Sequence, residues 1–153
     1  MLLTYQFEVN VDEKTSIILG HLCYAASKLF NVGNYERKEY KSLGFEKMPD
    51  WYDQKKRLKD SFWYKSLPSQ TSQDVLARLS ESWKSYYTLK SRYEYRKEQG
   101  LLRKHEGEPK APYYKKDGYH MNIKYLNKQF KVIDNMISIF FVIRSFRFSF
   151  MFS

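Results

Sequence analysis

Basic and tyrosine side chains are interleaved in one stretch of this sequence, and together they suit the binding of a polyanion. Residues 84–131 hold 13 Lys and Arg against 5 Asp and Glu, whereas residues 1–83 hold 12 against 11. Cations neutralise phosphates while aromatic rings stack on unpaired bases, a contact worth about 1–3 kcal/mol per base. We therefore predict that this stretch binds nucleic acid, RNA or DNA. The candidate binding residues are Lys84, Tyr87, Lys90, Arg92, Arg96, Lys97, Arg103, Lys104, Lys110, Tyr113, Tyr114, Lys115 and Lys116.

The same pattern has two other interpretations. A solvated helix face and a solubilising loop would also be rich in lysine, in a structural or protein-interaction module with an acidic protein partner. A stand-alone helix-turn-helix DNA-binding protein is the third, although the predicted flanking strands and the even spread of cations disfavour it. The formal net charge of +10 and the 18% aromatic content favour nucleic acid.

No catalytic residue set stands out. His21, His105 and His120 lack the spacing of metal ligands, and His21 and Cys23 point to different faces of a predicted helix. The sequence also lacks a phosphate-cradling GxxxxGKS loop and a serine-nucleophile elbow. We therefore predict a chain that is not itself an enzyme, with no catalytic residues, metal site, cofactor or small-molecule substrate.

The sequence favours the cytoplasm as its compartment. A single cysteine excludes an internal disulfide, and the N-terminal run lacks the charge and apolar stretch of a secretory signal. Arg144 and Arg147 interrupt the apolar C-terminal stretch, so we expect no membrane partner. The oligomeric state is left open.

Hydrophobic periodicity predicts helices that follow an opening strand. Apolar residues alternate over residues 5–11, as in a strand with one buried face. Spacings of three and four then predict a helix to about Ser42, with Gly44 ending it, and a shorter helix within residues 50–67.

A long helix and a return to strands are predicted in the second half. Thr71 and Asp74 have the spacing of a capping box, and the long helix should run from there to Gly100. Residues 101–118 form a connector rich in Gly, Pro and charge, after which apolar residues alternate again over residues 119–132. The fold class predicted is α+β and predominantly helical.

Three segments occur in an order similar to that of a known family. They are residues 5–9 with the helix over residues 24–31, which ends in an aromatic-Asn pair; residues 67–87; and the proline and aromatic-basic run over residues 109–115. The ordered series resembles the TnpB-type (OrfB-like) proteins of bacterial and archaeal insertion sequences, which are RNA-guided DNA endonucleases also described as accessory transposases.

The resemblance implies a fold and a partner. In that family this region forms a wedge-type barrel with a helical recognition insert that holds the guide RNA and the RNA–DNA hybrid. The corresponding division is a first barrel strand over residues 1–12, a helical recognition insert over 13–108, return strands of an incomplete barrel over 109–135, and an aberrant apolar tail over 136–153. The implied function is that of a nucleic-acid-binding N-terminal fragment linked to DNA transposition.

The sequence also departs from the family. The nuclease carboxylates and the zinc-finger cysteines should lie beyond residue 135, and neither set is present. We interpret the tail as the frameshifted or truncated end of a decayed element. The alternative is a genuine amphipathic edge strand, because Phe alternates with other residues over 146–153.

Overall fold

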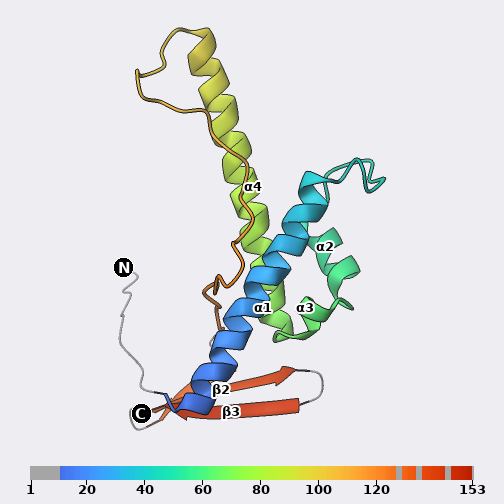
Figure 1. Cartoon of the computed structure of the whole chain (residues 1–153), viewed down its shortest axis with the longest axis vertical. Helices are drawn as coiled ribbons and strands as arrows, with labels where there is room; N and C mark the ends of the chain where they lie inside the picture. The colour runs from blue at the N-terminus through green and yellow to red at the C-terminus, as the bar shows by residue number, and fades with distance from the viewer. Residues whose placement is uncertain (1–10, 127–128, 134–135, 144–145, 153) are drawn as a thin grey trace.

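The computed structural model describes residues 11–126, 129–133, 136–143 and 146–152, and these are predominantly helical, with a small antiparallel sheet at the end of the chain (Figure 1). The opening strand predicted over residues 5–11 lies, except for Val11, outside the described residues. The elements are α1 (Glu13–Lys38), α2 (Trp51–Leu58), α3 (Phe62–Lys65), α4 (Ser69–Glu98), β1 (Phe130–Ile133), β2 (Met136–Ile143) and β3 (Phe146–Phe152).

Two long helices, α1 and α4, cross and form the core between them (Figure 1). Each presents an apolar stripe with the three- and four-residue spacing of one helix face. The C-terminal half of α4 extends beyond the other helices in Figure 1, and the chain then returns along it. The buried stripes are Leu22, Ala25, Ala26, Leu29 and Phe30 on α1, and Val75, Leu76, Leu79 and Trp83 on α4.

Gly33 is where α1 approaches α4 most tightly. A Cβ atom at this position would lie 2.9 Å from Leu79 Cδ2 and 3.0 Å from Leu76 Cδ2. The carbonyl of the buried Gly33 accepts a hydrogen bond from the fully buried Gln54 Nε2 (2.8 Å), and Gln54 Oε1 accepts one from Arg37 Nε (2.8 Å). These buried polar contacts attach α2 to α1 beside the crossing.

The shorter helix predicted within residues 50–67 is two helices. Asp50 caps α2, because its Oδ1 accepts a hydrogen bond from the backbone N–H of Asp53 (2.9 Å). Ser61 caps the four-residue α3 in the same way, accepting from Tyr64 N (3.4 Å). The chain then turns at Pro68 into α4.

The long helix is confirmed, but the predicted capping box is wrong. The helix α4 begins at Ser69, with Pro68 at its N-cap, so Thr71 lies inside the first turn. The Thr71 side chain is fully buried, and its hydroxyl faces Lys124 O (3.5 Å). Asp74 forms an ion pair with Arg78 (2.9 Å) rather than a box. Tertiary packing of the first turn therefore replaces the local cap.

Both long helices end near glycines, as predicted. The regular helix α1 stops at Lys38, four residues before the expected Ser42, and the chain leaves it through turns that end at Gly44. At the end of α4, Gly100 has φ +67°, and Leu101 N donates to Arg96 O (2.8 Å). This is the hydrogen bond of a Schellman motif, which needs a left-handed residue at the glycine position.

The return strand predicted over residues 119–125 is wrong, although the burial pattern is right. Met121 is buried, Ile123 and Tyr125 are half-buried, and the intervening residues are exposed, yet no strand pairing occurs there. The segment instead lies against a helix, and Met121 N donates to Cys23 O of α1 (3.0 Å). Alternation shows that one side is covered, but a helix can cover it as well as a strand.

Strand pairing begins only at β1. The sheet has the order β1-β2-β3 with antiparallel neighbours, and Phe130 pairs with Ile139 and Ile139 with Phe150. The stretch predicted as an aberrant tail thus forms the hairpin β2–β3. Among the described residues the sheet is open, so a wedge-type barrel is not confirmed. Of the return strands predicted over 109–135, the described residues contain only β1. In the insert predicted over 13–108, the last helix is α4, which ends at Glu98.

Candidate nucleic-acid interface

The candidate interface is a hollow between α4 and the connector, which we call the connector groove. It has a volume of about 360 Å³, and none of its lining residues carries a carboxylate. Four of the thirteen predicted binding residues meet here, two lysines and two tyrosines. The lining residues are Phe30, Ser82, Ser85, Tyr86, Leu89, Lys110, Pro112, Tyr113, Tyr114 and Lys115.

Two asparagines of α1 hold the connector in place. Asn31 makes both backbone hydrogen bonds of Lys115, donating from Nδ2 to its carbonyl (2.9 Å) and accepting at Oδ1 from its N–H (2.7 Å). The fully buried Asn34 donates from Nδ2 to Pro112 O (2.9 Å) and accepts at Oδ1 from Trp83 Nε1 (2.9 Å). The two side-chain amides therefore satisfy backbone groups of residues 112–115 with hydrogen bonds, as a neighbouring strand does in a sheet.

The connector continues along α1 in the opposite direction. Lys28 Nζ pairs with Asp117 Oδ1 at 2.6 Å, and this contact lowers the pKa of the Asp117 carboxyl. Farther on, Met121 N reaches Cys23 O, so connector numbers rise as α1 numbers fall. One face of α1 thus sets the position of the connector from Pro112 onward.

The two groove tyrosines differ in their environment. Tyr113 is 66% exposed, whereas Tyr114 is 44% exposed and has Lys38 Nζ 4.4 Å from its ring centroid. Partial burial raises the pKa of the Tyr114 hydroxyl. Both rings are accessible, which is what stacking on an unpaired base requires.

The two groove lysines also differ. Lys110 is exposed and has no ion pair within the described part of the chain. Lys115 is half-buried, with its Nζ 4.9 Å from the Phe30 ring centroid and 5.3 Å from that of Tyr119. These cation–π contacts hold the Lys115 ammonium over α1. Lys110 is accordingly the groove cation that is available to a phosphate.

Arg96, a predicted phosphate contact, is engaged within the chain. Its Nη1 pairs with Glu106 Oε1 (2.6 Å) and its Nη2 donates to Leu101 O (2.7 Å). The guanidinium thereby ties the end of α4 to the loop that follows. Its charge is balanced, so it serves the loop's structure.

Tyr87 and Lys84 lie outside the groove. Tyr87 is two residues from both Ser85 and Leu89, which places it about 200° around the helix axis from each. Its hydroxyl donates to Met48 Sδ (3.7 Å), and its ring lies 5.7 Å from that of Trp83. Burial against these neighbours raises the pKa of the Tyr87 hydroxyl. Lys84 is exposed on α4 and does not line the groove.

The remaining predicted cations surround the projecting end of α4 and the loop beyond it. Lys90 lies 3.9 Å from Glu94, an ion pair at i,i+4 spacing. Of the others, Arg92 and Lys97 are exposed on α4, Arg103 and Lys104 are exposed on the loop, and Lys116 is exposed on the connector just after the groove; none of them lines the groove.

Sequence reasoning missed the groove residues contributed by the helices. Ser82, Ser85 and Leu89 were not selected because they are neither charged nor aromatic, and Tyr86 is not among the thirteen predicted binding residues. Their spacing of three and four along α4 was the available signal, since it places them on one flank of the helix. Phe30 was noted only as the aromatic partner of Asn31.

Comparisons with known proteins do not assign the chain. No family model matches it, and no curated protein or solved structure matches it. The resemblance to TnpB-type proteins therefore stays a prediction. Within the described residues no three His, Cys, Asp or Glu side chains gather as metal ligands, and no helix is both long and apolar enough to cross a membrane.

Proposed function

We propose that this chain binds nucleic acid through the connector groove. The observation that carries the proposal is the pair of accessible rings, Tyr113 and Tyr114, fixed on an extended segment between Lys110 and Lys115. Stacking needs an exposed ring held in a defined position, and phosphate binding needs an unpaired cation nearby. A strand with unpaired bases satisfies both requirements, since its bases are free to leave their neighbours.

The charge around the groove supports a polymer as the ligand. Residues 84–131 carry a net charge of +8, most of it on α4 beyond the core and on the connector. Exposed cations over such a length raise the local concentration of a polyanion and speed its association. The groove then provides the short-range contacts, while the surrounding lysines and arginines contribute a sequence-independent attraction.

The finer proposal follows the resemblance to TnpB-type proteins. Residues 24–31, 67–87 and 109–115, which carry most of it, meet at α1, because Asn31 binds Lys115 and Asn34, one turn farther along α1, binds both Trp83 and Pro112. We propose that the helices hold the guide RNA and the RNA–DNA hybrid of a transposon-encoded protein, and that the remaining strands of a wedge-type barrel complete the sheet. This supports the nucleic-acid proposal and depends on it.

A helix-turn-helix mode fits the helices poorly. The helix that follows α2 has only the four residues Phe62–Lys65, about one turn, whereas a recognition helix must reach several bases. The protein-interaction alternative uses the same basic surface, so it is distinguished by the choice of competitor in the binding experiment.

The experiment measures binding of labelled single-stranded RNA and DNA to the purified chain by fluorescence anisotropy over a series of salt concentrations. We expect Tyr113→Ala to weaken binding by about 1–3 kcal/mol, the loss of one stacked base. Lys110→Ala should lower the slope of log K against log salt by about 0.7, the value for one phosphate contact on a single strand.

The matched controls are Tyr52→Ala, which removes an exposed tyrosine of α2, and Lys47→Ala, which removes an exposed lysine before α2. Both should bind like the parent. If the groove variants also bind like the parent, or if an acidic protein displaces the oligonucleotide and binds more tightly, the proposal is wrong.

A further inference from the structure

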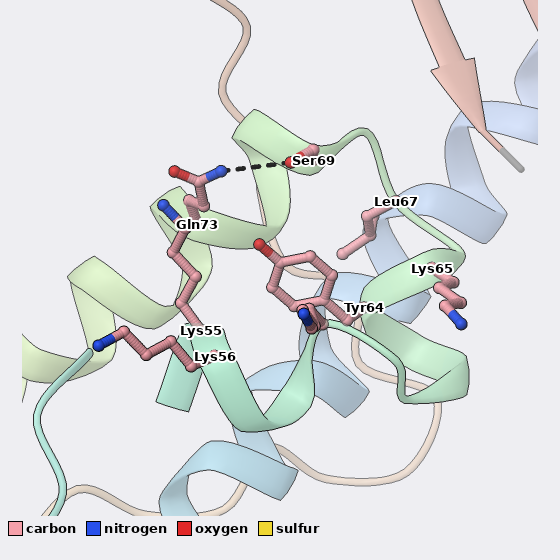
Figure 2. Close-up of a pocket in the computed structure, with 8 residues that line it drawn as sticks. Lys55, Lys56, Tyr64, Lys65, Leu67, Ser69 and Gln73 are labelled. Carbon is pink, nitrogen blue, oxygen red and sulfur yellow. Dashed lines mark hydrogen bonds between the residues drawn. The ribbon is translucent and has the colours of Figure 1, made fainter. Parts of the chain in front are cut away.

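A second hollow lies between α2, α3 and the first turn of α4, and we call it the lysine pocket (Figure 2). Its volume is about 520 Å³, within the range of about 300–1,000 Å³ that small-molecule sites occupy. Lys55 and Lys56 lie on α2, Lys59 follows directly after α2, and Lys65 ends α3. The lining residues are Lys55, Lys56, Lys59, Tyr64, Lys65, Leu67, Ser69 and Gln73.

Most of the charge of the lysine pocket is not balanced by an ion pair. Half of its lining residues are lysines, and no lining residue is acidic. Lys65 pairs with Asp60 (2.8 Å), but Lys55, Lys56 and Lys59 have no ion pair within the described part of the chain. Like charges gathered at one hollow repel one another, so an anion that binds there relieves this repulsion as well as making its own contacts.

The floor of the pocket is apolar and aromatic. Tyr64 and Leu67 are buried, and Figure 2 shows the Tyr64 ring at the centre, with its hydroxyl toward Ser69 and Gln73. Burial raises the pKa of the Tyr64 hydroxyl. Gln73 Nε2 donates to Ser69 Oγ (3.2 Å), so the Gln73 amide is a hydrogen-bonding group at the edge of the pocket. A planar ligand with polar edges therefore meets an apolar surface and a hydrogen-bonding group together.

We propose that the lysine pocket binds a nucleotide, with its phosphate at Lys55, Lys56 and Lys59 and its base against Tyr64 and Leu67. Inorganic phosphate would use only the lysines, and an uncharged aromatic ligand only the floor. A nucleoside monophosphate uses both, and the edge of its base reaches Gln73. The first turn of α4 adds the partial positive charge of a helix N-terminus to the same hollow.

This inference does not rest on the proposed function. Ser69 and Ser85 are sixteen residues apart on α4, which places them about 160° apart around its axis. The parts of α4 that line the lysine pocket and the connector groove thus lie on different flanks of the helix, with Ser69 and Ser85 more than four turns apart along it. A strand lying in the groove does not extend directly into the pocket.

The experiment titrates the full chain with the four nucleoside 5′-monophosphates by isothermal calorimetry. Inorganic phosphate, ribose 5-phosphate and the four nucleosides serve as part-ligands. We expect at least one nucleotide to bind about tenfold or more tightly than any part-ligand, and Gln73→Ala to reduce that preference. The double variant Lys55→Ala/Lys56→Ala should weaken nucleotide binding by about tenfold or more, because each lysine supplies a charge-assisted hydrogen bond.

The control Lys41→Ala/Lys47→Ala removes the same charge from the exposed loop before α2 and should bind nucleotide like the parent. Circular dichroism verifies that both double variants keep their helices. Equal binding of ribose 5-phosphate and nucleotide, absence of binding at millimolar nucleotide, or an unchanged affinity in the Lys55/Lys56 variant each overturns the inference.

Competition distinguishes the two sources of the nucleotide. A 5′-phosphorylated oligonucleotide that displaces the mononucleotide identifies the ligand as the end of a strand, and one that does not identifies it as a free nucleotide; both support the pocket. Groove variants such as Tyr113→Ala should leave mononucleotide binding unchanged, so failure of the groove and failure of the pocket give different results.

Discussion

The hydrogen bond from Trp83 to Asn34 joins the two long helices and, through the second hydrogen bond of Asn34, the connector. Asn34→Ala removes both contacts of a fully buried amide, Trp83 Nε1–Oδ1 (2.9 Å) and Nδ2–Pro112 O (2.9 Å). It leaves a buried indole N–H and a partly buried carbonyl without these partners. Each such group costs about 1–3 kcal/mol, so we expect the free energy of unfolding to fall by about 3 kcal/mol.

The assay is thermal and urea denaturation followed by circular dichroism. For a chain of this size a loss of about 3 kcal/mol lowers Tm by about 6–12 °C. Trp83→Phe keeps the ring but removes the donor, and a double-mutant cycle with Asn34→Ala isolates the pair. We expect a coupling free energy of about 1–2 kcal/mol, because the second substitution removes a group that the first has already left unpaired.

The control is Asn122→Ala, which removes an exposed asparagine from the segment that follows the connector and should change stability by about 0.5 kcal/mol or less. Additive effects in the Asn34/Trp83 cycle would refute the reasoning, because they would mean that the two side chains do not depend on each other. So would an Asn34→Ala variant as stable as the control.

Three further predictions test other features. Gly33→Ala should lower the free energy of unfolding by about 1–3 kcal/mol, because its Cβ would lie 2.9 Å from a leucine methyl of α4. Gly20→Ala should raise it by about 0.5–1 kcal/mol, because a Cβ there would meet no atom within 4 Å and alanine favours the helix. Denaturation measures both. Burial raises the pKa of the Tyr125 hydroxyl above its value in the unfolded chain. The stability that the neutral phenol contributes is therefore present below about pH 10 and is lost as the pH rises further. The Tyr125→Phe variant should lose less stability than the parent in an alkaline titration. Arg96→Ala should make the loop after α4 more susceptible to limited proteolysis and leave the salt slope of oligonucleotide binding unchanged, unlike Lys110→Ala, because its charge is already paired with a glutamate.

Local patterns in the sequence predicted the helices well. Val75, Leu76, Leu79 and Trp83 have the spacing of one helix face and form the buried face of α4, and Gly100 correctly indicated its end. These features depend on residues within a turn or two of one another. The start of α4 was misplaced because Thr71 satisfies a local capping pattern, yet its hydroxyl is buried against Lys124, which lies 53 residues away in the sequence.

Long-range partners were harder to predict. The alternation around Met121 and Ile123 correctly indicated one covered side, but the covering element is α1. Periodicity reports burial and says nothing of the element that provides it. The pairing of Asn31 with Lys115, 84 residues apart, leaves no trace in spacing, although two asparagines three residues apart on an otherwise apolar helix face mark a polar contact of some kind.

The candidate site shows what a count of charges leaves out. Composition located the basic stretch but treated every cation in it alike, whereas the structure separates the unpaired Lys110 from Arg96, whose charge is balanced by Glu106. The lysine pocket was missed because residues 1–83, which contain it, are nearly neutral in total. Acidic and basic residues that balance in a sum lie apart in space, so a neutral half of the chain can still hold a cationic hollow.

The two cationic hollows differ in how they are built, and this difference bears on their independence. The lysine pocket is formed by residues 55–73, which are close in sequence. The connector groove depends on Asn31 and Asn34 holding segments 84 and 78 residues away. Local opening of the connector therefore removes the groove while the pocket stays intact, because a contact of high sequence separation can be lost without unfolding the helices that surround it. A ligand in the groove stabilises the connector in return, so the groove, rather than the pocket, is the part of this molecule whose order depends on its partner.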